Sequence, residues 1–307
     1  MVRIEGGTFR MGSDRHYPEE APAHRVTVDG FWIDRAPVTN RQFRVFVKST
    51  GYVTFAEIAP DAKDYPGALP NMLEPGSMVF SPPPCPVDLR DCSQWWTFRH
   101  GANWKKPYGP MSSIKGYEDH PVVHVAFKDA EAYARWAGKE LPSEAEWEFA
   151  ARGGLDGAEF AWGDELAPGG RQMANTWHGD FPYRNTAAGT YQRTTRVGSF
   201  PPNGYGLSDM IGNVWEWTTD WYVSKHQAEV EKACCIPDNP RGGRAEDSFD
   251  PRQPRIRIPR KVVKGGSHLC APSYCRRYRP AARHAQPIDT SMSHVGFRCI
   301  AREGSRP

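Results

Sequence analysis

Hydrophobic residues recur at helical spacing after position 39. Thr39 is a typical N-cap, Phe43, Phe46 and Val47 fall on one helical face, and Gly51 ends the pattern. We therefore predict a helix between Thr39 and Gly51.

Two more helices are predicted in the middle of the chain. The first starts at Asp129, carries Tyr133 and three alanines on one face, and stops at Gly138. The second starts with a capping box formed by Ser143 and Glu146 and closes at a Gly-Gly pair. Both patterns are amphipathic, so we expect each helix to pack one face against a core.

Short apolar or alternating stretches predict strands between these helices and near both ends of the chain. They lie at 8–11, 26–28, 31–33, 122–125, 262–263 and 295–300. The regions 54–119 and 155–202 show neither period and contain many turn residues. There we expect long loops, the first of them packed through Trp95, Trp96, Phe98 and Trp104.

The composition favours one loop-rich unit. Glycine (29) and proline (28) together make up about 19% of the 307 residues, against about 12% in average proteins. Aromatic residues reach 12%, with 11 tryptophans, which argues against disorder. No internal repeat or linker divides the chain. We predict an α+β fold with little regular secondary structure, organised as a single domain over residues 1–307.

The charge pattern and the cysteine count limit the location and the partners. The net charge is only +3, and the basic excess towards the C-terminal end comes without a nucleic-acid-binding motif, so we expect a solvated basic rim rather than a nucleic-acid site. No apolar run approaches a membrane span or a signal peptide. Seven cysteines without regular spacing fit reduced thiols in the cytoplasm, although Cys85 with Cys92, or either of Cys234 and Cys235 with a distant partner, could still pair. We assign no chemistry to the Pro- and charge-rich stretch 218–260.

The richest candidate chemistry lies at Cys270 and Cys275, in a C-x4-C spacing. Two glycines precede this pair and Pro272 interrupts it, so we expect a bent loop that brings both sulfurs to one point. Arginines at 276, 277 and 279 would favour the thiolate form. Three interpretations stay open: a structural disulfide or paired free thiols, a zinc site for which only His268 is near, and a two-thiolate Cu(I) site.

A second candidate site combines carboxylates with irregular backbone. Asp209 and Glu216 offer side-chain oxygens, and the backbone from Gly212 to Val214 can turn carbonyls inward. Hard calcium prefers such an all-oxygen environment. Acidic residues near glycines are nevertheless more often solvated, so the residues alone leave both possibilities open.

Motifs along nearly the whole chain resemble those of the formylglycine-generating enzymes, also called sulfatase-modifying factors, of the bacterial type. In chain order they are GGTFRMGS at 6–13, PVTNRQF at 37–43, HPVVHV at 120–125, LPSEAEWEFAARGG at 141–154, NGYGLSDMIGNVWEW at 203–217, GGSHLCAPSYCRRYRPAAR at 265–283 and HVGFRC at 294–299. The two-cysteine loop is the part that resembles the catalytic branch. This resemblance implies the formylglycine-generating-enzyme fold, which is similar to that of C-type lectins.

The resemblance also implies an activity. It predicts a copper-dependent oxidase that uses molecular oxygen and a thiol reductant to convert a cysteine, in a C-x-P-x-R type motif of an unfolded or nascent sulfatase, to C-alpha-formylglycine (3-oxoalanine). Cys270 and Cys275 would hold Cu(I). By the same resemblance, supporting roles fall to Ser267, Trp215, Tyr274 and Arg283, the last of which would balance thiolate charge.

The resemblance implies structural calcium as well, with two departures from the family pattern. Asp209 and Glu216 through their side chains, and Gly212 and Val214 through their carbonyls, match a calcium site of the family. A second site would include Asn175, but Gly189 stands where an acidic ligand is common. Ala271 replaces a histidine that often follows the first cysteine.

One alternative belongs to another functional class. A non-catalytic binding module can share the C-type-lectin-like fold, because a fold does not determine a function. Loss of a loop cysteine would indicate such a module, and this chain keeps both. Hydrolase and nucleotide-binding motifs such as G-x-S-x-G, H-E-x-x-H and the P-loop are absent from the sequence.

Overall fold

The computed structural model describes residues 1–187, 193–226 and 235–302. It contains the three predicted helices. α1 spans Asn40–Thr50, and its N-terminus has a reciprocal capping box between Thr39 and Gln42. Gly51 adopts a left-handed conformation with φ of 69° and ends the helix, as expected.

The other two helices also lie where the pattern places them. α2 spans Phe127–Trp136 and begins before the expected Asp129, whose carboxylate accepts a hydrogen bond from the Ala126 backbone amide at 2.8 Å. Asp129 is therefore a residue of the first turn rather than the N-cap. α3 spans Glu144–Arg152, with the predicted Ser143 and Glu146 capping box, and it is buried along its whole length.

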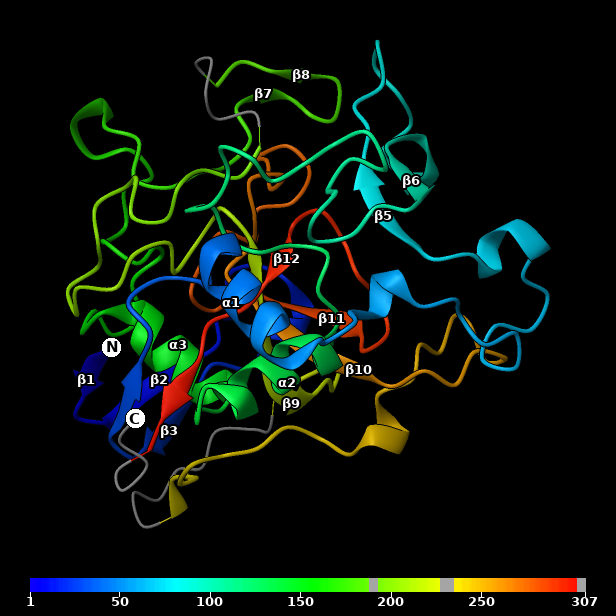
Figure 1. Ribbon diagram of the computed structural model, residues 1–307. Coiled ribbons are helices and arrows are strands. Elements are labelled where there is room, and N and C mark those ends of the chain that lie inside the picture. The colour runs from blue at the N-terminus through cyan, green and yellow to red at the C-terminus, as the bar shows by residue number, and fades with distance from the viewer. Residues whose placement is uncertain (188–192, 227–234, 303–307) are drawn as a thin grey trace.

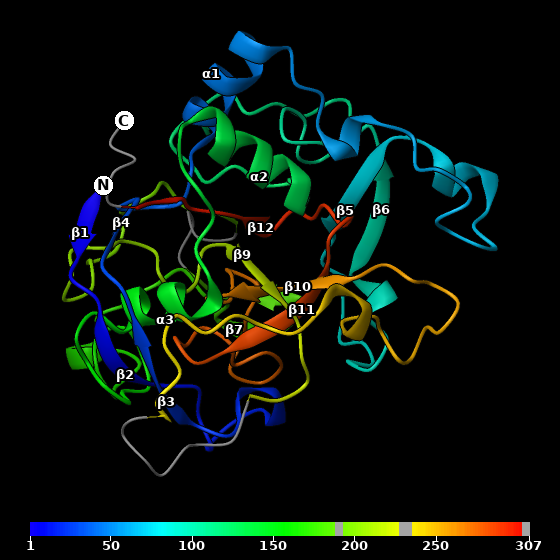
Figure 2. The same ribbon diagram turned by 90° about the horizontal axis from the view of Figure 1, so that it is seen from below.

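A four-stranded sheet forms the centre of the molecule (Figures 1 and 2). Its order is β11 (Arg283–Pro287), β10 (Arg260–Lys264), β9 (Trp215–Trp221) and β12 (Val295–Gly296). Only the pairing of β12 with β9 is parallel. The strand at β10 confirms the prediction for 262–263, whereas β9 was not predicted.

A three-stranded sheet joins the two ends of the described chain. Here β4 (Phe31–Ile33) lies between β1 (Val2–Ile4) and β13 (Ile300–Ala301). The hairpin of β2 (Gly7–Met11) and β3 (His24–Val28) lies next to it along the chain. The strands predicted near 8–11, 26–28 and 31–33 are confirmed.

Two strand predictions need correction. Residues 122–125 form no strand, because His124 has a φ of 60° and breaks the extended backbone. The single strand expected over 295–300 is instead divided into β12 and β13, which pair with β9 and with β4. This segment therefore crosses from the central sheet to the three-stranded sheet.

The regions expected to be loops contain two hairpins that the sequence pattern did not reveal. β5 (Gly76–Phe80) pairs with β6 (Trp96–His100), and the two-residue strands β7 (Gly179–Asp180) and β8 (Arg184–Asn185) pair with each other. Short 3-10 turns complete the described structure at Pro18–Glu20, Phe55–Glu57, Pro70–Leu73, Cys92–Gln94, Pro168–Gly170 and Ala245–Asp247. Most of the chain is irregular, which confirms the loop-rich α+β class.

The buried side chains form one large cluster and one small one. The large cluster includes Trp147 of α3, Trp217 of β9 and Phe43 of α1, all fully buried. The small cluster contains Trp95, Trp177, Phe181, Leu269 and Ala271. The two-cysteine loop therefore rests on aromatic side chains from segments that are distant in sequence.

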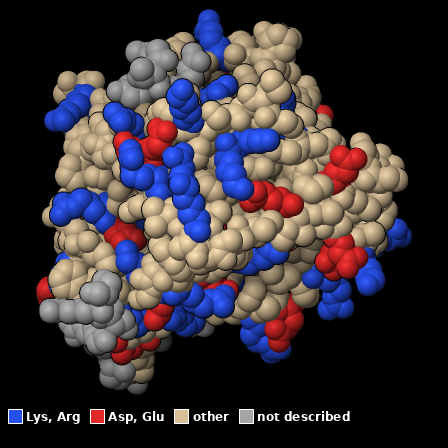
Figure 3. All heavy atoms as spheres, viewed as in Figure 1, with Lys and Arg blue, Asp and Glu red and all other residues tan. Residues whose placement is uncertain are grey.

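The expected basic rim is wrong in part. Lys264, Arg279 and Arg283 are buried and paired with carboxylates instead of lying on the surface. On the face shown in Figure 3, basic and acidic side chains are interspersed. Among the described residues, no helix combines the length and the apolar character that crossing a membrane requires.

Candidate functional site

The two-cysteine loop leaves β10 through two positions whose backbone conformation requires glycine. Gly265 and Gly266 have φ of 89° and 69°. A Cβ on Gly265 would lie 2.7 Å from the Met210 carbonyl oxygen, and one on Gly266 would lie 2.8 Å from the Arg277 carbonyl oxygen. The turn therefore packs the start of the loop closely against Met210 and Arg277.

The loop brings both sulfurs together, as its spacing predicts. The Cys275 amide donates to the Ala271 carbonyl at 2.9 Å, which closes a turn between the cysteines. Their Sγ atoms are 3.2 Å apart, whereas a disulfide bond measures about 2.0 Å. Both are free thiols, Cys270 buried and Cys275 partly exposed. The structure thus presents a pair of converging soft ligands.

The environments of the two thiols differ. Burial raises the pKa of Cys270 well above its ordinary value. The pKa of Cys275 is lowered to about 7, first by the hydrogen bond from Cys270 and then by the guanidinium of Arg277. The pair is therefore poised as one thiol and one thiolate near neutral pH, with the negative charge on Cys275.

Only one of the three arginines expected to favour the thiolate reaches it. Nη1 of Arg277 lies 3.9 Å from the Cys275 Sγ. Arg276 contacts Glu159, and Arg279 forms a buried ion pair with Glu20. The expectation is confirmed for Arg277 and wrong for the other two side chains.

A cavity of about 280 Å³ opens beside the sulfurs. Three of the predicted supporting residues, Ser267, Trp215 and Tyr274, line it together with both cysteines. The Ser267 backbone amide donates to the Cys270 Sγ at 3.4 Å. Tyr274 stacks on Phe181 with ring centroids 4.5 Å apart.

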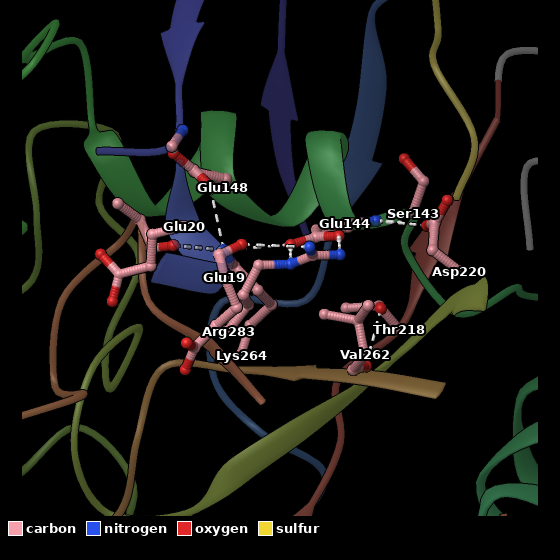
Figure 4. A network of polar contacts seen from close by, with 12 residues as sticks. Glu19, Glu20, Ser143, Glu144, Glu148, Thr218, Asp220, Val262, Lys264 and Arg283 are labelled. Atoms are coloured by element: carbon pink, nitrogen blue, oxygen red, sulfur yellow. Dashed lines mark hydrogen bonds and ion pairs between the residues drawn. The ribbon is translucent and has the colours of Figure 1, made fainter. Parts of the chain in front are cut away.

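The fourth supporting residue, Arg283, is not among the residues that line this cavity. It donates two hydrogen bonds of 2.7 Å to the Glu144 carboxylate, and a further hydrogen bond reaches the Glu19 carbonyl. Figure 4 shows it among Glu144, Glu148 and Lys264, below α3. Its charge is compensated there, so it does not balance the thiolates.

The cavity also contains residues to which sequence analysis gave no role. They include His284, Gln286, Met292 and His294. Strand alternation offered a signal for His284, because side chains at successive positions of β11 face opposite sides and Arg283 points away. Burial lowers the pKa of His294 well below its ordinary value, so its imidazole is neutral at pH 7.

The predicted calcium ligands lie in the strained and buried stretch that leads into β9, and Glu216 is the second residue of that strand. Asp209 has a φ of 53°. Glu216 already accepts hydrogen bonds from Arg298 at 2.7 and 2.8 Å and from the Trp147 indole at 2.7 Å. Its charge is therefore compensated within the protein.

Asp209 is the predicted ligand whose charge is less well compensated. Its carboxylate accepts a hydrogen bond from the Gly198 amide at 2.7 Å, and no cationic side chain of the described residues pairs with it. Burial raises its pKa to about 6. A bound cation would stabilise its anion, so this residue fits calcium better than Glu216 does.

The doubtful second calcium site is only partly described. The Asn175 side chain is fully buried, and its Oδ1 has no hydrogen-bond partner. Gly189, the departure from the family pattern, lies outside the described residues. Across residues 1–187, 193–226 and 235–302, no group of three or more His, Cys, Asp or Glu side chains that could hold a metal ion is found. Either calcium site would therefore depend on amide and backbone oxygens.

Comparison with known families accounts for the arrangement. Residues 1–303 match the Sulfatase-modifying factor enzyme 1-like domain. The chain belongs to the formylglycine-generating enzyme family.

Two relatives are similar to this chain along most of their length. A formylglycine-generating enzyme of Mycobacterium tuberculosis is 54% identical over 302 residues, which cover 98% of this chain and 97% of the relative. A bovine relative named inactive C-alpha-formylglycine-generating enzyme 2 is 34% identical, covering 100% of this chain and 89% of that protein. The family thus includes a protein described as inactive.

Solved structures support the fold. PvdO from Pseudomonas aeruginosa aligns with a TM-score of 0.62 at 23% identity, covering 98% of this chain and 93% of that one. Treponema denticola variable protein 1 aligns with a TM-score of 0.58 at 17% identity, covering 98% and 94%. At these identities the likeness concerns the fold alone, and it agrees with the predicted fold class.

Proposed function

We propose that this formylglycine-generating enzyme family member converts a cysteine in a C-x-P-x-R type motif of sulfatases to C-alpha-formylglycine. The observation that carries the proposal is the pair of thiols 3.2 Å apart at the wall of a cavity. The name of the M. tuberculosis relative supports the same activity. A binding module would have no need for two converging sulfurs in a cavity.

The donor set fits Cu(I). Thiolates are soft ligands that select monovalent copper, and Cys270 and Cys275 would hold the ion. When bound, copper supplies the one-electron chemistry that lets molecular oxygen react with a thiolate. The protein contributes the cavity, in which Trp215 and Tyr274 would hold the client peptide and exclude water.

The conversion balances with one oxygen molecule and two reductant thiols per client cysteine. The Cβ–S bond of the client cysteine breaks and a C=O bond forms at the same carbon. The sulfur leaves as hydrogen sulfide, the second oxygen atom leaves as water, and the reductant thiols become a disulfide. The client carbon is oxidised by two electrons and the reductant supplies two more, which together reduce oxygen fully.

Calcium would be held separately from this chemistry. Asp209 and Glu216, with the carbonyls of Gly212 and Val214, are the proposed ligands, and Asp209 contributes the less compensated charge. The role would be structural, because this stretch leads directly into Trp215 of β9.

The test is mass spectrometry of a synthetic peptide with a C-x-P-x-R motif, incubated with the protein, copper, a thiol reductant and air. We expect the peptide mass to change from cysteine to aldehyde. A peptide with serine in place of the cysteine is the matched control and should stay unchanged. No conversion by protein shown to contain copper would overturn the proposed activity and favour the binding module.

A further inference from the structure

The N-terminal segment Tyr17–Glu20 contacts the residues that follow Cys275 in the two-cysteine loop. Pro18–Glu20 forms a 3-10 turn, and Tyr17 precedes it. The Tyr17 hydroxyl accepts a hydrogen bond from the Arg276 backbone amide at 3.0 Å. Glu20 binds Arg279 through a buried two-point ion pair. These contacts tie the residues that follow Cys275 to a segment more than 250 positions earlier in the chain.

Arg277 connects this segment to the reactive sulfur. Its Nη2 donates to Glu19 at 2.6 Å, its guanidinium lies 3.7 Å from the centre of the Tyr17 ring, and its Nη1 faces the Cys275 Sγ at 3.9 Å. The planar guanidinium thus has three fixed partners, so it has little freedom to turn. Glu19 holds one edge of the Arg277 guanidinium, and the other edge faces the Cys275 sulfur.

The ion-pair network below α3 holds the Tyr17–Glu20 segment in place. Arg283 donates to the Glu19 backbone carbonyl at 3.2 Å and is in turn bound by Glu144 (Figure 4). The Glu20 carbonyl accepts from the Ser13 amide at 3.0 Å. Glu19 is therefore anchored through its backbone, and its side chain is aimed at Arg277.

We propose that Glu19 is a positioning residue for the reactive pair: acting through Arg277, it holds Cys275 in register with Cys270. The effect on turnover that we expect rests on the proposed function, whereas the alignment of the two thiols does not depend on it. Cys275 is partly exposed and follows a loop with Pro272 at its centre, so the turn alone constrains its sulfur on one side only. Arg277 supplies the second constraint.

The experiment measures how well the two thiols are aligned, without client peptide or copper. The full chain is equilibrated with oxidised and reduced glutathione at a fixed pH. The bond of oxidised glutathione breaks, a bond forms between Cys270 and Cys275, and the two thiol protons end on two reduced glutathione molecules. The equilibrium constant gives the effective concentration of one thiol at the other.

Three variants make the measurement specific. Glu19→Gln removes the charge that holds Arg277, and Arg277→Lys keeps a positive charge but loses the planar fork. Glu57→Gln is the matched control, because Glu57 is similarly buried (17% against 16% exposed) and forms a similar ion pair, 2.7 Å from Lys105, remote from the loop in sequence. The melting temperature of each variant is recorded to exclude unfolding.

We expect Glu19→Gln and Arg277→Lys to lower the effective concentration by about tenfold, with Glu57→Gln and all melting temperatures close to the parent. With a client peptide, kcat of Glu19→Gln should fall and its KM should stay, because Glu19 does not line the cavity. An unchanged thiol equilibrium in Glu19→Gln, or full retention in Arg277→Lys, would overturn the inference. Absence of turnover in the parent would contradict only the proposed function, because the thiol equilibrium does not depend on it.

Discussion

The two-cysteine loop and the Asp209–Glu216 stretch use charge in opposite ways. In the loop, the sulfurs of Cys270 and Cys275 face each other, and the nearest guanidinium is 3.9 Å away. In the stretch, the Glu216 carboxylate is bound directly by the guanidinium of Arg298. The first arrangement leaves ligand atoms available to a further partner, whereas the second satisfies one of them inside the protein.

The difference shows that the type and spacing of residues do not by themselves decide which residues are available as ligands. Both regions contain the predicted donors and both are largely buried. What separates the cysteines from Glu216 is how closely a counter-charge approaches: Arg277 lies 3.9 Å from the Cys275 sulfur, whereas Arg298 donates to the Glu216 carboxylate at 2.7 and 2.8 Å. Four experiments test this distinction, beginning with the one that removes a sulfur.

Replacing a loop cysteine should have the largest effect. Cys270→Ser and Cys275→Ser each remove one soft ligand, so we expect conversion of a C-x-P-x-R peptide to fall below detection and copper binding to weaken strongly. Circular dichroism should show an intact fold, because serine has nearly the same volume as cysteine. Cys85→Ser, at an exposed thiol, is the control and should retain parent activity. Residual copper-dependent conversion in either loop variant would remove the basis for the two-thiolate site.

Breaking the pair at Glu216 should cost the most stability. Glu216→Gln leaves the buried guanidinium of Arg298 without its counter-charge, so we expect about 3–5 kcal/mol less stability in urea unfolding. Glu131→Gln, at an exposed ion pair with Arg135, should change stability by less than about 1 kcal/mol. A loss in Glu216→Gln no greater than that of Glu131→Gln would mean that the pair is not the main role of this carboxylate.

Asp209 should make stability depend on both pH and calcium. Its folded-state pKa is raised to about 6, so its neutral form favours the folded state at low pH, and this contribution of about 3 kcal/mol is lost as pH rises from about 4 to about 6. Asp209→Asn should remove that dependence. At pH 7.5, calcium should raise the melting temperature of the parent but not of Asp209→Asn.

Asp129→Asn is the control for the calcium measurement. Burial also raises the pKa of Asp129 to about 6, but this residue belongs to α2, outside the predicted ligand set. Its variant should keep the full calcium-induced rise in melting temperature. If the rise survives in Asp209→Asn as well, calcium binds elsewhere or the assignment is wrong.

The smallest effect concerns which loop cysteine reacts. Because the pKa of Cys275 is lowered to about 7 and that of Cys270 is raised, iodoacetamide should label Cys275 with a rate that is half-maximal near pH 7. Peptide mapping by mass spectrometry identifies the labelled residue. Arg277→Gln should move the midpoint upward by about one pH unit. Faster labelling of Cys270 than of Cys275 would reverse the assignment of the thiolate.

Local signals were enough to predict the helices and the convergence of the sulfurs. The caps at Thr39 and Ser143 and the turn between the cysteines involve residues within a few positions of one another. The family resemblance added the fold, and the comparisons support it.

Features that depend on distant pairing were not predictable. β9 pairs with β10 across a stretch that gave no chemical signal, and the β5–β6 hairpin is interrupted by a proline-rich connection. The charged residues were misread for the same reason. Arg283 pairs with Glu144, 139 positions away, and no spacing rule indicates that contact. Sequence patterns report contacts between nearby positions, whereas these buried ion pairs join residues that are far apart in the chain.

The order of synthesis determines when β13 can pair with β4. Ile300 pairs with Ile33, so the three-stranded sheet joins the earliest and the latest parts of the described chain. During translation, β4 cannot pair with its second neighbour until residues 300–301 have been synthesised. Such remote pairing slows folding and leaves an unpaired strand edge exposed in the meantime. The edge of β4 that pairs with β13 would therefore be open to non-native strand pairing until residues 300–301 are in place.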